Sequence, residues 1–219
     1  MIYGQPLRIL HSLLALCMLG QLAIGELMDV PGAQDADEQA AISLIQPALA
    51  HGGHHAAQQM IIVEETLGYQ VHEILGLTIA GLLLIRLMLA FSSIPGASWR
   101  GLFPWLSGEG RCALLSESKA QATGWKQGKL APPEEGETVA RAVHGFMLLT
   151  ALGIATAGVA LFFGWNEHGR QSELIEFVGE THETLVGLFE ALLGAHVLAV
   201  ILHQMQGHNI LTRIRPGKS

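Results

Sequence analysis

The chain has 219 residues, of which 50% are apolar and only 14% are charged. An ordinary soluble domain carries about a quarter charged residues, so the composition argues against that class and favours an integral membrane protein. The formal charge of -7 decides little, because the charged residues are unevenly distributed along the chain. The two cysteines, Cys17 and Cys112, form no C-x-x-C or C-x-x-C-H motif. This excludes a thiol redox pair and covalent c-type haem attachment.

Four apolar stretches are long enough to cross a bilayer, which takes about 20 mostly apolar residues. They are residues 8–26, 69–91, 142–165 and 181–204. The first is short, but no small-residue cleavage site is obvious after it, so a membrane span is favoured over a cleaved signal peptide. The sequence therefore predicts an all-α fold, with one domain over residues 1–219 that forms an integral membrane four-helix bundle.

Lysine and arginine predict the orientation of the bundle, because positive residues stay in the cytoplasm. The segment 27–68 has none, whereas the segment 92–141 and the C-terminal tail carry most of them. Both termini and the 92–141 linker are therefore expected in the cytoplasm, and the loop 27–68 outside. Residues 94–108 combine aromatic rings with Arg100, as at a membrane interface. Residues 107–138 are polar and rich in Gly and Pro, which predicts a flexible linker.

Histidines inside the spans are the main functional signal. Five lie within spans and a sixth lies at an edge: His11, His72, His144, His182 and His196, with His203 at the edge. A single intramembrane histidine could equally be a hydrogen-bonded packing residue. Ionisable residues in a membrane are costly and usually functional, so five of them together favour a set of sites.

Two of these histidines share the fourth span. His182 and His196 are fourteen residues apart, or about 21 Å at the helical rise. Fourteen residues are two heptads, so in a left-handed bundle both side chains face the interior on one seam. Two imidazoles at two levels of one helix are what two haems require from a shared helix.

Each haem then needs a second axial ligand from another helix. The second span starts at the outer face, so His72 matches the depth of His182. His11 and His196 each lie about 15 residues from the outer ends of their spans, whereas His144 lies about 21 residues in, some 9 Å lower at the helical rise. The depth count therefore predicts the pairs His72/His182 outside and His11/His196 inside.

These features resemble the prokaryotic di-haem cytochrome b-561 family, which includes the cytochrome b subunits of nickel–iron hydrogenases and formate dehydrogenases. "VHEILGLTIAGLLLIRLMLAF" looks like the second helix of the family, and "THETLVGLFEALLGAHVLAVILHQMQGHNILTRIRPGK" is similar to its fourth helix and basic tail. The resemblance covers the four spans. It implies two haem b groups with His11, His72, His182 and His196 as iron ligands, in agreement with the depth count.

The resemblance also implies a function. The expected protein is a multi-pass b-type cytochrome of the bacterial inner membrane that carries electrons between a periplasmic redox partner and the quinone pool. The partner would be a c-type cytochrome or a dehydrogenase or hydrogenase subunit, and nothing in the chain suggests nucleic acid. Two alternatives stay open: a superoxide:quinone oxidoreductase, disfavoured by the acidic outer loops, and a histidine-rich metal transporter or sensor.

Some polar residues have less defined roles. Candidates for contact with a quinone or a haem propionate near the inner face are Arg86, Arg141, His144 and His203. The outer motif "HGGHH" (His51, His54 and His55) could bind copper, nickel or zinc, although adventitious binding is favoured. His168 has no assigned role. Glu190 lies between the two expected haem levels, where packing polarity is favoured over a proton relay.

Overall fold

The computed structural model describes residues 3–27, 67–129, 137–164 and 173–214, and every regular element in these segments is helical. Four helices are long: α1 (Gln5–Leu27), α3 (Leu67–Ala90), α6 (Glu137–Gly164) and α7 (Glu173–Met205). Each is long and apolar enough to cross a membrane. The prediction of an all-α membrane bundle with four spans is therefore confirmed. Residues 28–66 of the expected loop 27–68, with the "HGGHH" motif, lie outside the described residues.

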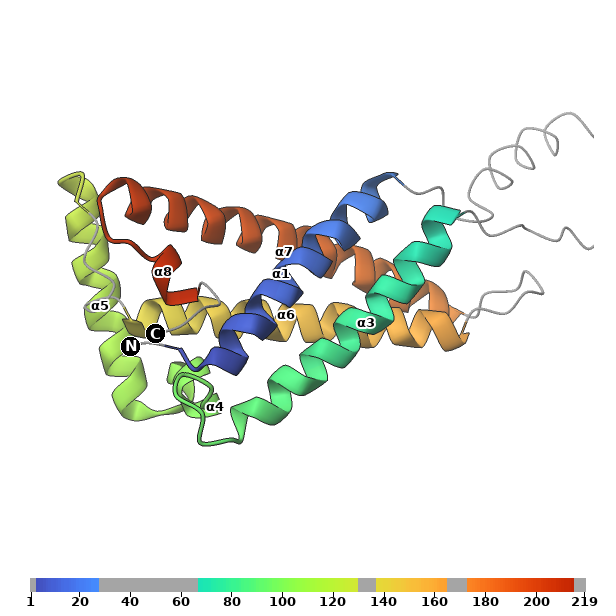
Figure 1. The fold of residues 1–219 in the computed structure, drawn as a ribbon, viewed down its shortest axis with the longest axis horizontal. Helices are drawn as coiled ribbons and strands as arrows, with labels where there is room; N and C mark the ends of the chain where they lie inside the picture. Colours follow the sequence, from blue (N-terminus) through green and yellow to red (C-terminus); the bar gives the residue numbers. More distant parts are fainter. Residues whose placement is uncertain (1–2, 28–66, 130–136, 165–172, 215–219) are drawn as a thin grey trace, which may run out of the picture.

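The four long helices form a bundle with unequal contacts (Figure 1). Close packing joins α1 to α3, α3 to α6, and α6 to α7. Among the described helices, α7 packs closely against α6 and at most loosely against α1 and α3. The space between α7 and the helices α1 and α3 is therefore wider than the space between the helix pairs that pack closely.

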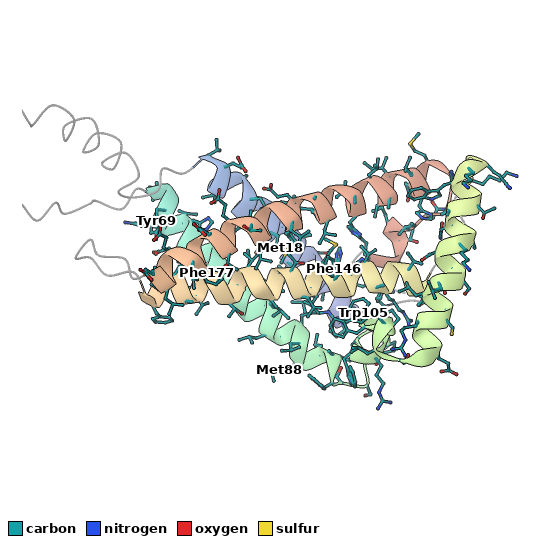
Figure 2. The ribbon with its side chains drawn as sticks, turned by 180° about the vertical axis from the view of Figure 1, so that it is seen from behind. Met18, Tyr69, Met88, Trp105, Phe146 and Phe177 are labelled. Atoms are coloured by element: carbon teal, nitrogen blue, oxygen red, sulfur yellow. The ribbon has the colours of Figure 1, made fainter. Side chains whose placement is uncertain are left out.

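The short elements gather at one end of the bundle, which we call the α5 end (Figure 1). They are α4 (Trp99–Leu102), the 3-10 helix η2 (Pro104–Leu106), α5 (Gly108–Lys126) and α8 (Leu211–Ile214). Helix α8 contacts α1. The first and last helices thus meet at this end, as an even number of spans requires. Figure 2 shows Trp105 near the α5 end, and Tyr69 and Phe177 at the opposite end.

The outer surface of the bundle is suited to lipid. Large apolar side chains stay exposed on the long helices; Leu16 is 71% exposed and Met88 is 73% exposed. A patch of this kind on a soluble protein would be an interaction or aggregation site. The buried interior is small and centres on Ile79, Leu83, Ala151 and Phe189. The buried cluster lies midway along the bundle and is bordered by Met18 (Figure 2).

The prediction of a flexible linker over 107–138 is wrong for most of that segment, because α5 occupies Gly108–Lys126. Ser107 caps this helix: its Oγ accepts a hydrogen bond from the Gly110 N–H at 3.0 Å, which supplies a partner for a backbone donor of the first turn. Three of the glycines that suggested flexibility, Gly108, Gly110 and Gly124, fall in the first and last turns of α5. The two adjacent prolines of the segment lie beyond it, at positions 132 and 133.

Helix α5 is attached to the start of α6 by one carboxylate. Glu117 accepts hydrogen bonds from the backbone N–H of Thr138 at 2.8 Å and of Val139 at 3.1 Å, and from the Thr138 hydroxyl. A negative charge at this point also meets the positive end of the α6 dipole. Glu117 therefore acts as a helix cap supplied by another helix.

Candidate functional site

Histidines lie at two positions along the bundle, which we call levels, on the side of α7 that faces α1 and α3. At the level farther from α5, His182 of α7 and His72 of α3 are close enough to interact electrostatically. The His182 Nδ1 lies 3.1 Å from the Ile154 carbonyl oxygen of α6. Because a carbonyl only accepts, the hydrogen bond requires a proton on Nδ1, which leaves Nε2 with a free lone pair.

His72 is held by its backbone and leaves its ring available. Its carbonyl accepts a hydrogen bond from Gln21 Nε2 of α1 at 3.0 Å, which ties α3 to α1. Its Nδ1 is buried and has no hydrogen-bond partner among the described residues. A buried imidazole nitrogen without a partner is costly unless a ligand uses the ring. Sequence reasoning missed Gln21, although a glutamine within an apolar span is itself a signal.

Glycines of neighbouring helices lie against both rings of this level. A Cβ added at Gly25 of α1 would lie 3.6 Å from His72 Cε1. A Cβ added at Gly158 of α6 would lie only 3.2 Å from His182 Cε1. Neither glycine was singled out from the sequence, because each lies on a different helix from the imidazole that it contacts.

The second level lies nearer the α5 end. His11 of α1 interacts electrostatically with His196 of α7, and both interact with His144 of α6. The rings of His144 and His196 are in edge contact, with centroids 5.0 Å apart and planes at 65°. The structure thus brings three histidines together, from three helices, where the depth count expected two.

The expected depth of His144 is therefore wrong. The count placed it about 9 Å below His196 at the helical rise, because it started from residues 165 and 181. In the structure α6 ends at Gly164 but α7 begins at Glu173, eight residues earlier than expected (181 − 173). Measured from these ends, His144 and His196 lie at similar depths.

Phe189 separates the two levels. It is seven residues from both His182 and His196, on the same heptad seam, and is only 5% exposed. It is also the one buried residue of α7. The next residue, Glu190, is partly buried and forms no hydrogen bond or ion pair with a residue that the structure describes. The aromatic ring, rather than the carboxylate, fills the seam between the levels.

Arg86 of α3 lies beside the second level, and a second arginine, Arg8, is buried about one turn from His11 on α1. Arg86 Nη1 donates to the Ala97 carbonyl at 3.3 Å, and Arg86 interacts electrostatically with Tyr3 and with His144. Arg8, three residues before His11, is 8% exposed and its Nε donates to the Tyr3 carbonyl at 2.9 Å. The sequence drew attention to Arg86 but not to the buried Arg8.

The other two expected contact residues, Arg141 and His203, have partners outside the second level. Arg141 forms an ion pair with Glu137 at 2.6 Å and lies against Gly101 of α4. His203 faces His208 beyond the end of α7, with the two Nδ1 atoms 2.9 Å apart. Helix α4 itself reaches α6 beside His144: a Cβ at Gly145 would collide with the Leu102 carbonyl. His168 lies outside the described residues.

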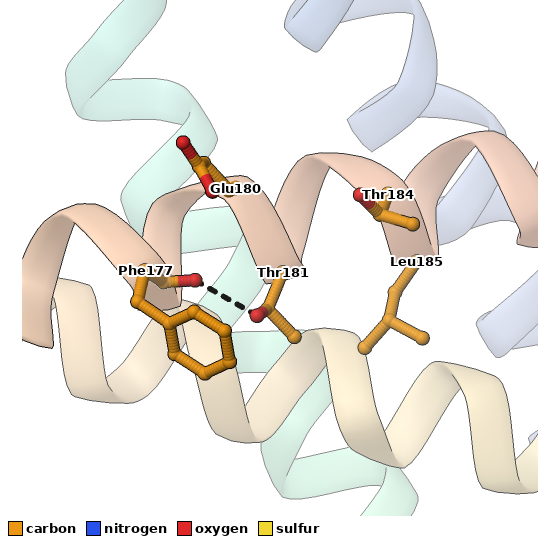
Figure 3. A pocket seen from close by; sticks show the side chains of 5 residues that line it. All are labelled: Phe177, Glu180, Thr181, Thr184 and Leu185. Atoms are coloured by element: carbon orange, nitrogen blue, oxygen red, sulfur yellow. Dashed lines mark hydrogen bonds between the residues drawn. The ribbon is translucent and has the colours of Figure 1, made fainter.

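A surface groove of about 230 Å³ lies on α7 near the end opposite α5. Figure 3 shows its lining residues, Phe177, Glu180, Thr181, Thr184 and Leu185, with Thr181 donating to the Phe177 carbonyl. Thr184 lies two residues from His182, or about 200° around the helix. The groove is therefore on another face of α7 from the histidines.

The geometry suits haem iron better than a directly bound metal ion. No group of three or more metal-ligating side chains that could hold an ion occurs in the described segments. Instead, imidazoles from separate helices oppose each other at two levels. A family model described as prokaryotic cytochrome b561 matches residues 2–217. Comparison with curated proteins and with solved structures gave no match. The chain belongs to the prokaryotic cytochrome b561 family and is a multi-pass, haem-b-binding membrane protein of electron transfer.

Proposed function

We propose that the protein is a di-haem cytochrome that carries electrons between a periplasmic redox partner and the quinone pool. In this proposal it is a single domain of the bacterial inner membrane, with both termini and the α5 end in the cytoplasm. His72 and His182 hold the outer haem, and His11 and His196 hold the inner one. Haem b with two imidazole ligands supplies one-electron transfer when bound.

The environment of His182 carries the proposal. A histidine that ligates a metal usually donates its other ring N–H to a carbonyl or carboxylate, which fixes the ring and the tautomer. The Ile154 carbonyl at 3.1 Å supplies this acceptor and leaves Nε2 as the ligand atom. His72, from a different helix, interacts electrostatically with that ring and has an unpaired buried Nδ1.

The spacing of the helices supports the same assignment. Helices that pack directly lie about 8–10 Å apart, whereas two imidazoles joined through iron hold their helices farther apart. Both proposed pairs link α7 to α1 or α3, the helices against which it packs at most loosely. The small residues Gly25 and Gly158 leave room beside the ligand rings on the flanking helices.

The residues at the α5 end support a quinone reaction there. Arg86 and His144 lie beside the inner pair and are suited to contact a haem propionate or a quinone head group. His203 lies one heptad below His196 and could exchange a proton with the cytoplasm. The electron donor is identified only by its class: it is a c-type cytochrome, or a dehydrogenase or hydrogenase subunit, as the family resemblance implies.

Haem stoichiometry tests the ligand pairs. His182→Ala or His72→Ala should remove the outer haem, and His196→Ala or His11→Ala the inner one. Each purified variant should therefore hold one haem b per chain by pyridine haemochrome assay, against two in the parent. His144→Gln is the matched control and should keep two. If His144→Gln lost a haem while His11→Ala kept both, the inner pair would be wrong.

Quinol titration tests the proposed reaction separately. Addition of a short-chain quinol to the oxidised protein should produce the reduced b-type spectrum. Superoxide added to the same protein should reduce it much more slowly, because the expected outer surface is acidic and repels an anion. Faster reduction by superoxide than by quinol would favour the superoxide oxidoreductase alternative.

A further inference from the structure

We propose that His203 and His208 form a binding site for a divalent transition metal at the α5 end of the bundle. Neither residue belongs to the proposed haem pairs. His203 lies in the last turn of α7, and His208 lies in the connection between α7 and α8. The site does not depend on the haem assignment, but it competes with the proton exchange proposed above for His203, because a bound metal ion would occupy the Nδ1 of that ring.

The chain reverses after α7 so that the two imidazoles converge. The His208 N–H donates to the His203 carbonyl at 3.1 Å. Gly207 and Asn209 flank His208 with φ values of 80° and 46°. A positive φ is uncommon for a residue with a side chain, although asparagine adopts it more readily than most. The backbone is therefore shaped to bring the Nδ1 of His208 to the Nδ1 of His203.

The spacing of the two nitrogens fits metal coordination. The Nδ1 atoms are 2.9 Å apart, with ring centroids at 5.2 Å. Metal–imidazole bonds are about 2.0–2.1 Å long, so two nitrogens at right angles around one ion lie about 2.9 Å apart. This is the arrangement of neighbouring ligands in the square-planar or tetragonal sites of copper(II) and nickel(II). Tetrahedral zinc requires a wider separation, of about 3.3 Å.

The protonation state of the two imidazoles allows a metal ion to replace the hydrogen bond between them. Without an ion, one Nδ1–H donates to the other Nδ1, so the two atoms share one proton. A metal ion between them takes both Nδ1 lone pairs, and the shared proton moves by way of water to Nε2 of the ring that donated it. Both rings stay neutral imidazoles, and no side chain has to change its charge.

Two side-chain ligands define the class of ion. The described residues include no third metal-ligating side chain grouped with this pair, so water would complete the coordination. Among divalent first-row ions, copper(II) binds nitrogen ligands most strongly. Gln206 Nε2 also reaches the Gly128 carbonyl at 3.4 Å, which places the site beside the end of α5. A bound ion would fix the turn between α7 and α8 in this position.

Copper(II) titration of the full haem-loaded chain tests the site. The background chain carries no histidine tag and has His51, His54 and His55 replaced by alanine, so that the "HGGHH" motif contributes no imidazole. We expect one copper(II) ion per chain, with two nitrogen ligands by electron paramagnetic resonance. His208→Ala should weaken binding by roughly tenfold or more, at least the loss caused by removing an outer-shell partner of a metal ligand.

Gln206→Ala is the matched control, since it alters the same turn without removing an imidazole, and its copper affinity should equal that of the background chain. His203→Ala should also weaken binding. If His203→Ala loses its haem spectrum through misfolding, His208→Ala decides, because His208 lies beyond the end of α7. Equal copper affinity in His208→Ala and in the background chain, or no copper binding by the background chain, would overturn the proposal.

Discussion

At the residue scale, the imidazoles of the outer level are bordered by glycines of the facing helices. The glycines on α7 near the histidines, Gly187 and Gly194, have no described atom within 4 Å of an added Cβ. The glycines that contact the rings are Gly25 and Gly158, on the facing helices. Sequence proximity to a candidate ligand is therefore a poor guide to the glycines that contact its ring, because those glycines lie on the facing helix.

Gly158→Ala should disturb His182, the proposed ligand of the outer haem. The added Cβ would lie 3.2 Å from His182 Cε1, so the ring or α6 must shift. Overpacking of this kind costs about 1–3 kcal/mol. We expect altered low-spin g values of one haem by electron paramagnetic resonance.

Two alanine variants calibrate this result. Gly25→Ala makes an ordinary 3.6 Å contact with His72 and should change the spectrum less. Gly81→Ala is the control, because its Cβ meets no described atom within 4 Å and it lies nine residues from His72, or about 180° around α3. Equal spectra for Gly158→Ala and Gly81→Ala would contradict the geometry.

Phe189→Ala should destabilise both levels together. Its buried ring fills the seam between them, and removal of a buried phenylalanine costs about 3–5 kcal/mol. Haem release on heating should therefore begin at a lower temperature and affect both of the proposed haems. Leu188→Ala, at a position that is 40% exposed, should have a much smaller effect. Loss of one haem alone would argue against a shared seam.

The fourteen-residue spacing of His182 and His196 made one seam of α7 predictable, because heptad periodicity is local to the sequence. The depth of His144 was not predictable in the same way. It depends on where α6 ends and α7 begins, and polar residues such as Glu173 and Glu176 continue α7 before the apolar run. The Ile154 carbonyl could not be found either, since every residue has a carbonyl and only packing selects this one.

At the element scale, α5 shows that a polar segment next to a membrane can be ordered by a few capping contacts. Its composition is that of a linker, and hydropathy carries no signal for it. Ser107 at its start and Glu117 on the face toward α6 supply the missing partners. A cap between two helices far apart in the sequence cannot be inferred from either helix alone.

Glu117→Gln should loosen α5 from α6. The amide keeps one acceptor oxygen but loses the charge and one of the two acceptors that contact Thr138 and Val139. Loss of a capping interaction costs about 1 kcal/mol, so limited proteolysis within α5 should become faster while the haem spectrum is unchanged. The exposed Glu109→Gln in the first turn of α5 is the control and should leave the rate unaltered. Equal proteolysis rates in the two variants would show that the Glu117 contacts do not hold α5.

At the scale of the whole molecule, the four spans were predictable because length and apolarity alone determine them. The family match and the helical structure confirm that part. The orientation of the bundle is still a prediction from lysine and arginine. The structure adds that α8 lies beside α1 at the same end as α5, so the location of α5 decides the orientation of the whole molecule.

The native cysteines allow this orientation to be measured. Cys112 is exposed on α5, whereas Cys17 is partly buried within α1. If the α5 end is cytoplasmic, a membrane-impermeant maleimide should label Cys112 only after spheroplasts are lysed, and Cys112→Ser should abolish the signal. Glu26→Cys, introduced into the Cys112→Ser variant, places a cysteine at the other end of α1. The maleimide should label this cysteine in intact spheroplasts. Labelling of Cys112 in intact spheroplasts would show that the bundle has the opposite orientation. The His11/His196 level would then lie near the outer face, and the proposed quinone reaction would take place there.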